Sequence, residues 1–198
     1  MELHALTAEI SIVIPTHNTR DTVRPILCLI DEACQGMRWE AIFVDDDSND
    51  GTADMVRRFA REDERVRCIK RIGRHGKVSA AIEGMLSCSA PYIAVMKPDM
   101  GIGSNALPKL VQKLIQGDDQ IVLATSAQSE PSGAGVKGLM QRFSKAEKGT
   151  PTEMIAVIHD LVEPLARKLE TKNDWFYTDN FNKLEDTVRL SQFDVDSL

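Results

Sequence analysis

Five short apolar runs, most of them rich in β-branched residues, recur along the first two thirds of the chain. They occupy residues 10–14, 39–44, 66–70, 92–96 and 120–125. Between them lie segments with helix-capping residues and helical spacing, over residues 21–34, 52–64, 78–87 and 104–117. Continuous apolar runs suit strands that are buried on both faces. The alternation therefore predicts an α/β fold, with a mostly parallel sheet flanked by helices.

Composition narrows the class of protein. The 198 residues are 42% hydrophobic and 27% charged, as in an ordinary soluble domain. The net charge of −6 argues against nucleic acid as a partner. No apolar run approaches the roughly 20 residues that span a bilayer, and no signal peptide is visible. We expect a cytoplasmic protein that is at most peripheral to a membrane.

One stretch is strongly basic. Nine cations lie between residues 57 and 77, namely Arg57, Arg58, Arg61, Arg65, Arg67, Lys70, Arg71, Arg74 and Lys77. They form either a solvated helix face with basic flanks or a local positive field that attracts an anionic ligand. The sequence leaves both interpretations open.

The last third has a different pattern. Residues 126–138 are rich in Gly, Ser and Pro, which is typical of a loop. Residues 139–148 and 152–171 are predicted to be helical. The second segment carries apolar residues at helix spacing that favour core packing or a partner contact, namely Ile155, Ile158, Leu161, Val162, Leu165 and Leu169. The pattern of residues 173–198 is too weak for an assignment.

Polar motifs follow three of the predicted strands. They read PTHN (15–18), DDDSNDGT (45–52) and KPDM (97–100). Ligands of open α/β sheets bind beyond the carboxyl ends of the strands, so the three motifs should meet at one edge. Turn and capping roles explain Asp47 to Thr52, but not Asp45 and Asp46. Carboxylates there can accept hydrogen bonds from a base N–H or a ribose hydroxyl.

A fourth motif, HGKVSAAIEG, spans residues 75–84. Gly76 permits a tight entry into a helix, and Ala80, Ala81 and Gly84 let that helix approach the sheet closely. Lys77 is less expected, because a cation in the first turn opposes the helix dipole. A phosphate between Lys77 and the helix N-terminus would remove that conflict.

The order of these motifs, IPTHN, VDDDSNDGT, GKVSAAIEG and VMKPDM, resembles the inverting family-2 glycosyltransferases of the Rossmann-like GT-A fold. The similar branch is that of dolichol- and polyprenyl-phosphate mannosyl- and glucosyltransferases. The match covers about residues 10–125, and four common motifs in order are fairly specific. The resemblance implies a nucleotide-sugar-binding core over residues 1–125, with residues 126–198 as a divergent helical part of the same domain.

The resemblance also implies roles for matching residues. Pro15, Thr16 and Asn18 would line a nucleotide pocket, and Asp45 and Asp46 would hold the base and ribose of a UDP- or GDP-sugar. Asp99 would be the second acid of a metal-binding Asp-x-Asp pair. In such enzymes Mg²⁺ or Mn²⁺ offsets charge on the donor diphosphate.

The chain departs from the family pattern at four positions. Lys97 replaces the first acid of the metal pair, Gly101 replaces a polar residue, Asp47 replaces a glycine and Thr19 replaces a glutamate. Divalent ions need several oxygen ligands, and a unit charge pair at about 4 Å is worth about 4 kcal/mol at an effective dielectric near 20. We therefore expect a degenerate metal site, in which Lys97 and Lys77 neutralise the diphosphate instead.

The expected function is hexosyl transfer from a nucleotide-sugar, with inversion and without a metal, to a lipid phosphate or a glycan. The alternative is a degenerate, non-catalytic relative that binds a nucleotide or, through its C-terminal helices, a partner protein or a second copy. A nicotinamide-dependent oxidoreductase is disfavoured because no G-x-G-x-x-G follows the first strand. The sequence does not choose among the candidate bases Asp160, Asp174, Asp179 and Glu185.

Overall fold

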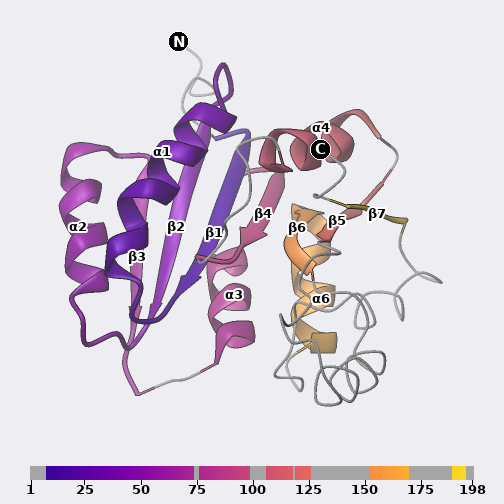
Figure 1. Ribbon diagram of the computed structural model, residues 1–198. Coiled ribbons are helices and arrows are strands. Elements are labelled where there is room, and N and C mark those ends of the chain that lie inside the picture. The colour runs from indigo at the N-terminus through magenta and orange to yellow at the C-terminus, as the bar shows by residue number, and fades with distance from the viewer. Residues whose placement is uncertain are drawn as a thin grey trace, which may run out of the picture.

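The computed structural model describes residues 8–73, 76–98, 106–117, 119–125, 152–169 and 189–194 (Figure 1). Its strands are β1 (Ile10–Thr16), β2 (Trp39–Asp46), β3 (Val66–Arg71), β4 (Tyr92–Met96), β5 (Ile121–Thr125), β6 (Thr152–Ile158) and β7 (Leu190–Asp194). Its helices are α1 (Val23–Ala33), α2 (Thr52–Glu62), α3 (Lys77–Leu86), α4 (Ala106–Gln116) and α6 (Val162–Leu169), with short 3-10 turns η2 (Arg20–Thr22) and η3 (His159–Leu161).

The seven strands form one sheet in the order β3-β2-β1-β4-β6-β5-β7. Strands β1 to β4 pair in parallel, and β5 pairs in parallel with β7. Strand β6 runs antiparallel to both of its neighbours, β4 and β5. The predicted α/β class, the five predicted strands and the mostly parallel sheet are therefore confirmed.

Each face of the sheet carries its own apolar core. Side chains of a strand alternate between the two faces, so Ile12 and Ile14 lie on one side and Val13 on the other. The first side packs against α1, α2 and α4, and the second packs against α3 and α6. The result is a three-layer arrangement in which β1, β2 and most of β4 are shielded from water on both faces, whereas β3 exposes Arg67 and Lys70.

Helix α3 lies unusually close to the sheet. Ala80 and Ala81 are fully buried, and a Cβ added at Gly84 would lie 2.9 Å from Val44 Cγ2 and still closer to Val13. Real Cβ atoms do not approach other atoms so closely, so a side chain at position 84 would push the helix outwards. The predicted close packing of this helix is confirmed.

The helix predicted over residues 152–171 is wrong in its first half, where the chain forms strand β6 instead. Residues Met154 to Val157 are buried on both faces, so the strand shows no alternation of polar and apolar residues. Such a run cannot be told from a buried helix by its spacing. Val162 and Leu165 do lie on α6 and are buried in the core, as expected.

The described part of the last third thus contributes two strands, β6 and β7, besides helix α6. The helix predicted over residues 139–148 and the loop predicted over 126–138 lie outside the described residues. Within the described ranges, none of the helices has the length and apolarity needed to cross a bilayer.

Candidate functional site

A pocket of about 240 Å³ opens where β1, β2 and β4 end and α3 begins. Its walls are formed by Pro15, Thr16, His17, Thr19, Asp46, Lys77, Ala80, Lys97 and Pro98. The motifs that follow these three strands therefore meet at one edge, together with the start of the α3 motif. This is the place where open parallel sheets bind their ligands.

The pocket brings together five of the eight residues expected to bind a ligand, namely Pro15, Thr16, Asp46, Lys77 and Lys97. Two further residues, Asn18 and Asp45, lie nearby but do not line it. Asp99 lies outside the described residues.

The two neighbouring carboxylates of β2 are separated by the alternation of the strand. Asp45 follows Phe43 on the side of α1 and α2, where it is fully buried and its Oδ2 accepts a hydrogen bond of 3.2 Å from the backbone N–H of Ser48. Asp46 lies on the side of α3 and reaches the pocket. Asp45 therefore shapes the following turn, while Asp46 is the acid that a ligand can touch.

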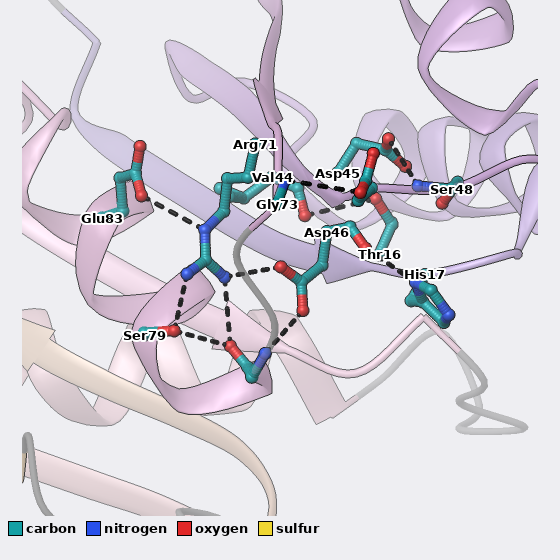
Figure 2. A network of polar contacts seen from close by, with 12 residues as sticks. Thr16, His17, Val44, Asp45, Asp46, Ser48, Arg71, Gly73, Ser79 and Glu83 are labelled. Atoms are coloured by element: carbon teal, nitrogen blue, oxygen red, sulfur yellow. Dashed lines mark hydrogen bonds and ion pairs between the residues drawn. The ribbon is translucent and has the colours of Figure 1, made fainter.

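Asp46 is held by contacts to both of its carboxylate oxygens (Figure 2). Arg71 Nη1 donates to Oδ1 at 2.8 Å, and the backbone N–H of Gly76 donates to Oδ2 at 2.7 Å. The side chains of Arg71 and Asp46 are only 3% and 9% exposed. Because a carboxylate oxygen can accept more than one hydrogen bond, Asp46 keeps capacity for a ligand in the pocket.

Arg71 also binds the start of α3 (Figure 2). Its Nη2 donates to Ser79 Oγ at 2.7 Å, and its Nη1 also donates to the carbonyl oxygen of Gly76 at 3.1 Å. Its Nε lies 3.2 Å from Glu83 Oε2, an ion pair without hydrogen-bond geometry. The guanidinium is therefore enclosed by two carboxylates and the first turn of α3.

Hydrogen bonds join the loop after β1 to the loop after β2. The side-chain oxygen of Asn18 accepts from the N–H of Asn49 at 3.0 Å, and Asp50 accepts from the N–H of Arg20 at 3.0 Å and of Thr52 at 2.9 Å. Burial alone would raise the pKa of Asp50. The hydrogen bonds that Asp50 accepts, from these two N–H groups and from the Thr52 hydroxyl, outweigh burial, so the pKa of Asp50 lies below its usual range. Asn18 thus braces the rim of the pocket.

His17 lines the pocket in a defined orientation, and the sequence interpretation missed it. Its Nδ1 lies 2.7 Å from the carbonyl oxygen of Asp46, which can only accept, so Nδ1 carries the proton. Its Nε2 then accepts from Asn18 Nδ2 at 3.2 Å. The sequence signal that could have indicated His17 was its position between Thr16 and Asn18 in the PTHN motif.

Part of the basic stretch is paired with neighbouring acids. Four of its arginines form ion pairs, namely Arg57 with Asp54, Arg65 with Asp63, Arg67 with Glu40 and Arg71 with Asp46. Of the stretch as far as the structure describes it, Lys77 alone lines the pocket. The cations that line the pocket are therefore Lys77 and Lys97, while Arg57, Arg65, Arg67 and Arg71 pair with acids.

The described walls of the pocket present one carboxylate, Asp46, beside two ammonium groups. Within the described ranges, no group of three or more His, Cys, Asp or Glu side chains could hold one. The wall after β4 presents Lys97, and Lys77 lies in the same pocket. Two ammonium groups repel a divalent ion, which prefers several oxygen ligands.

Asp160 is excluded as a catalytic base by its position. It lies in η3 directly after β6, and Ile158 at the end of β6 pairs with Tyr92 at the start of β4. The pocket lies beyond the other end of β4, so Asp160 is at the opposite edge of the sheet. The other candidates, Asp174, Asp179 and Glu185, lie outside the described residues.

Sequence comparison finds relatives among lipid-phosphate sugar transferases. The chain is 32% identical over 111 residues to dolichol-phosphate mannosyltransferase of Pyrococcus furiosus, and this aligned region covers 56% of this chain and 31% of that protein. It is 29% identical over 115 residues to undecaprenyl-phosphate 4-deoxy-4-formamido-L-arabinose transferase of Pseudomonas syringae, covering 57% and 34%. The matched region thus spans about a third of these two relatives.

Solved structures share the fold over nearly the whole chain. Glucosyl-3-phosphoglycerate synthase of Mycobacterium tuberculosis, in complex with Mn²⁺, UDP-glucose and phosphoglyceric acid, has a TM-score of 0.72 at 18% identity, covering 95% of this chain and 70% of that chain. A mannosyltransferase of Pyrobaculum calidifontis, in complex with GDP-Man and Mn²⁺, has a TM-score of 0.69 at 17% identity, covering 96% and 56%. These likenesses confirm the expected fold.

The family follows from a broader match. The model of glycosyl transferase family 2 matches residues 11–178, which is most of the chain and includes every described residue that lines the pocket. The chain therefore belongs to glycosyl transferase family 2.

Proposed function

We propose that this chain transfers a hexose from a nucleotide-sugar bound in the pocket beyond β1, β2 and β4. The observation that carries the proposal is the meeting of Asp46, Lys77 and Lys97 in one pocket of a family-2 chain. A carboxylate accepts hydrogen bonds from a nucleoside, and ammonium groups attract phosphates. The GDP-Man and UDP-glucose complexes of the structural neighbours support a GDP- or UDP-sugar as the donor.

The lining residues divide the work of binding. In this proposal Asp46 holds the base or ribose, and Pro15, Thr16 and His17 form the wall beside it. Lys77 and Lys97 face the diphosphate. All of them belong to residues 1–125, the region that we assign to donor binding.

The proposed reaction needs no metal. The acceptor oxygen attacks the sugar's anomeric carbon from the face opposite the diphosphate, and the bond from that carbon to the diphosphate oxygen breaks with its electron pair. The anomeric centre is inverted, and the acceptor's proton passes to a base. Lys77 and Lys97 stabilise the charge that develops on the leaving diphosphate, as preorganised cations do. The sequence Lys97-Pro98-Asp99 supports this role, because a cation stands where the family resemblance places the first metal-binding acid.

The proposed acceptor is a lipid phosphate. The two sequence relatives described above are named for dolichol phosphate and undecaprenyl phosphate, which supports a polyprenyl phosphate rather than a glycan. A chain that acts on such a lipid would work at a membrane surface, and we propose the cytoplasmic face.

The test combines binding and transfer. Thermal-shift measurements with GDP-mannose and UDP-glucose, in excess EDTA, should show stabilisation of the wild-type chain by at least one of them. Asp46→Asn should weaken that binding about tenfold or more, because a charge-assisted hydrogen bond is lost. The matched control Glu40→Gln, at the other end of β2, should bind like wild type.

Transfer to a polyprenyl phosphate should then continue in EDTA. Activity that disappears in EDTA and returns with Mn²⁺ would rule out the metal-independent mechanism. The second candidate function, a non-catalytic nucleotide-binding protein, is favoured by Lys97 itself, since the family resemblance expects an acid there. Donor binding without hydrolysis or transfer would support that candidate.

A further inference from the structure

Arg71 is the one cation that is buried among the residues described by the structure, at 5% exposure. Removing a guanidinium from water costs free energy, so its position needs an explanation beyond surface charge. Arg71 ends β3, directly opposite Asp46 at the end of β2. Arg71 does not line the pocket. Two residues that do are Asp46, which Arg71 contacts, and Lys77, which follows its contact Gly76 in the chain. Arg71 therefore acts on the pocket through its neighbours.

The guanidinium binds three acceptors on two elements. They are Asp46 Oδ1 at 2.8 Å, the carbonyl oxygen of Gly76 at 3.1 Å and Ser79 Oγ at 2.7 Å. Because the guanidinium is planar and its donors have fixed directions, it sets the positions of these acceptors relative to one another. A lysine, with a single nitrogen on a flexible stem, could not do the same.

The contacts close a ring. Asp46 accepts from Arg71 with one oxygen and from the N–H of Gly76 with the other, while Gly76 returns its carbonyl oxygen to Arg71. Lys77 is the next residue after Gly76 and the first of α3. The carboxylate wall and the lysine wall of the pocket are thus joined through one side chain.

We infer that Arg71 is a positioning residue for donor binding, which holds Asp46 and Lys77 in the places where a nucleotide meets them. The inference rests on the proposed function for the identity of the ligand. Glu83 supports this role, because its ion pair occupies the remaining Nε side of the guanidinium. Each nitrogen of the Arg71 guanidinium therefore contacts a polar group of the chain, and Arg71 orients these groups without touching the ligand itself.

The experiment compares two arginines of the same strand. Arg71→Met removes the planar donors, and Arg71→Lys keeps the charge. The matched control is Arg67→Met, which breaks the Arg67–Glu40 pair at the opposite edge of the sheet. Each variant is studied as the full chain, and binding is corrected for the folded fraction measured by urea unfolding.

Two measurements decide the inference. Hydrogen exchange of the Gly76 amide should become about tenfold faster or more in Arg71→Met, because local opening frees that N–H, and should change less than about twofold in Arg67→Met. The Kd of the nucleotide-sugar that binds wild type, UDP-glucose or GDP-mannose, should rise about tenfold or more in Arg71→Met. Arg71→Lys should restore part of the affinity. A merely structural role would lower stability and leave the Kd unchanged.

A double-mutant cycle separates positioning from general damage. In an Asp46→Asn background, Arg71→Met should weaken binding less than about threefold further, because both changes remove the same oriented acceptor. Full additivity, an unchanged Kd in Arg71→Met or an unchanged Gly76 exchange rate would each overturn the inference. If wild type bound neither nucleotide, the proposed function would fail, and the exchange of Gly76 would still decide whether Arg71 holds the two walls.

Discussion

The two ends of α3 are fixed by the same kind of contact in two different environments. At its C-terminal end, Arg67 Nη1 donates to Glu40 Oε2 and to the carbonyl oxygen of Ser87, each at 3.0 Å. At its N-terminal end, Arg71 joins Asp46 and Gly76 in a corresponding way. Both arginines come from β3 and both carboxylates from β2. The Arg67–Glu40 pair lies near the starts of these two strands, and the Arg71–Asp46 pair lies at their ends.

The difference between the two pairs is their access to water. The Arg67 side chain is 45% exposed, whereas that of Arg71 is 3% exposed. A pair that water can reach contributes little, while a buried pair depends on both members being present. A cation also suits the C-terminal end of a helix better than the N-terminal end. The end of α3 beside the pocket is therefore the one that carries the larger electrostatic cost.

The largest predicted effect follows from removing the acid at the buried end. Asp46→Ala leaves Arg71 buried with Glu83 as its remaining carboxylate partner in the network. We expect the free energy of unfolding, measured in urea, to fall by about 3 kcal/mol, near the lower limit for breaking a buried pair. The matched variant Glu40→Ala should cost about 1–2 kcal/mol, because water can solvate Arg67. Equal losses would remove the contrast between the two ends.

An intermediate effect concerns the pH dependence of Glu40, the buried partner of the exposed Arg67. Burial alone would raise the pKa of Glu40. Hydrogen bonds from the Ser11 hydroxyl, Arg67 and the Ser89 N–H outweigh burial, so the pKa of Glu40 lies below the usual glutamate range. The stability that this carboxylate contributes is complete above the pKa of an unfolded glutamate and is lost as the pH falls through the lowered folded pKa.

Glu40→Gln should therefore be less stable than wild type at neutral pH, and the gap should narrow steadily on acidification. Urea unfolding of both proteins from about pH 7 to about pH 3 measures it. A gap that stays constant, or that widens in acid, would contradict the assigned direction of the Glu40 pKa.

The smallest predicted effect lies in the loop at the pocket edge. Asp47 has a φ of +59°, in the left-handed region where glycine is favoured, and the family resemblance places a glycine there. Asp47→Gly should raise the free energy of unfolding by about 0.5 kcal/mol. Relief of strain should exceed both the added entropy of the unfolded chain and the loss of one long, exposed hydrogen bond, in which the Gly73 N–H donates to Asp47 Oδ2 at 3.4 Å. Asn18→Gly, at a φ of +51°, should not stabilise, because the Asn18 side chain bonds Asn49 and His17.

Much of the fold was predictable because its signals are local. The strands β1 to β5 and the helices α1 to α4 have apolar runs or helical spacing that lie within single segments. The gathering of PTHN, Asp46 and Lys97 at one edge then follows from the parallel sheet. The split between Asp45 and Asp46 also follows from strand alternation, once the strand is known to reach Asp46.

The remaining features depend on contacts between distant residues. Arg71 was one of nine cations within residues 57–77, and only the register of β3 against β2 places it opposite Asp46. Strand β6 is apolar on both faces, so its spacing could not separate strand from helix. Its antiparallel place between β4 and β5 is a property of the assembled sheet and has no local signal.

That placement has a consequence for how the chain can be divided. Among the described strands, β5 is joined to β4 through β6, which comes later in the chain. A fragment cut after Thr125 would carry β5 with no strand beside it and leave one side of β4 unpaired. A fragment that carries residues 1–125, the proposed donor-binding region, should therefore also need residues 152–158, which follow β5 in the chain and complete the sheet between β4 and β5.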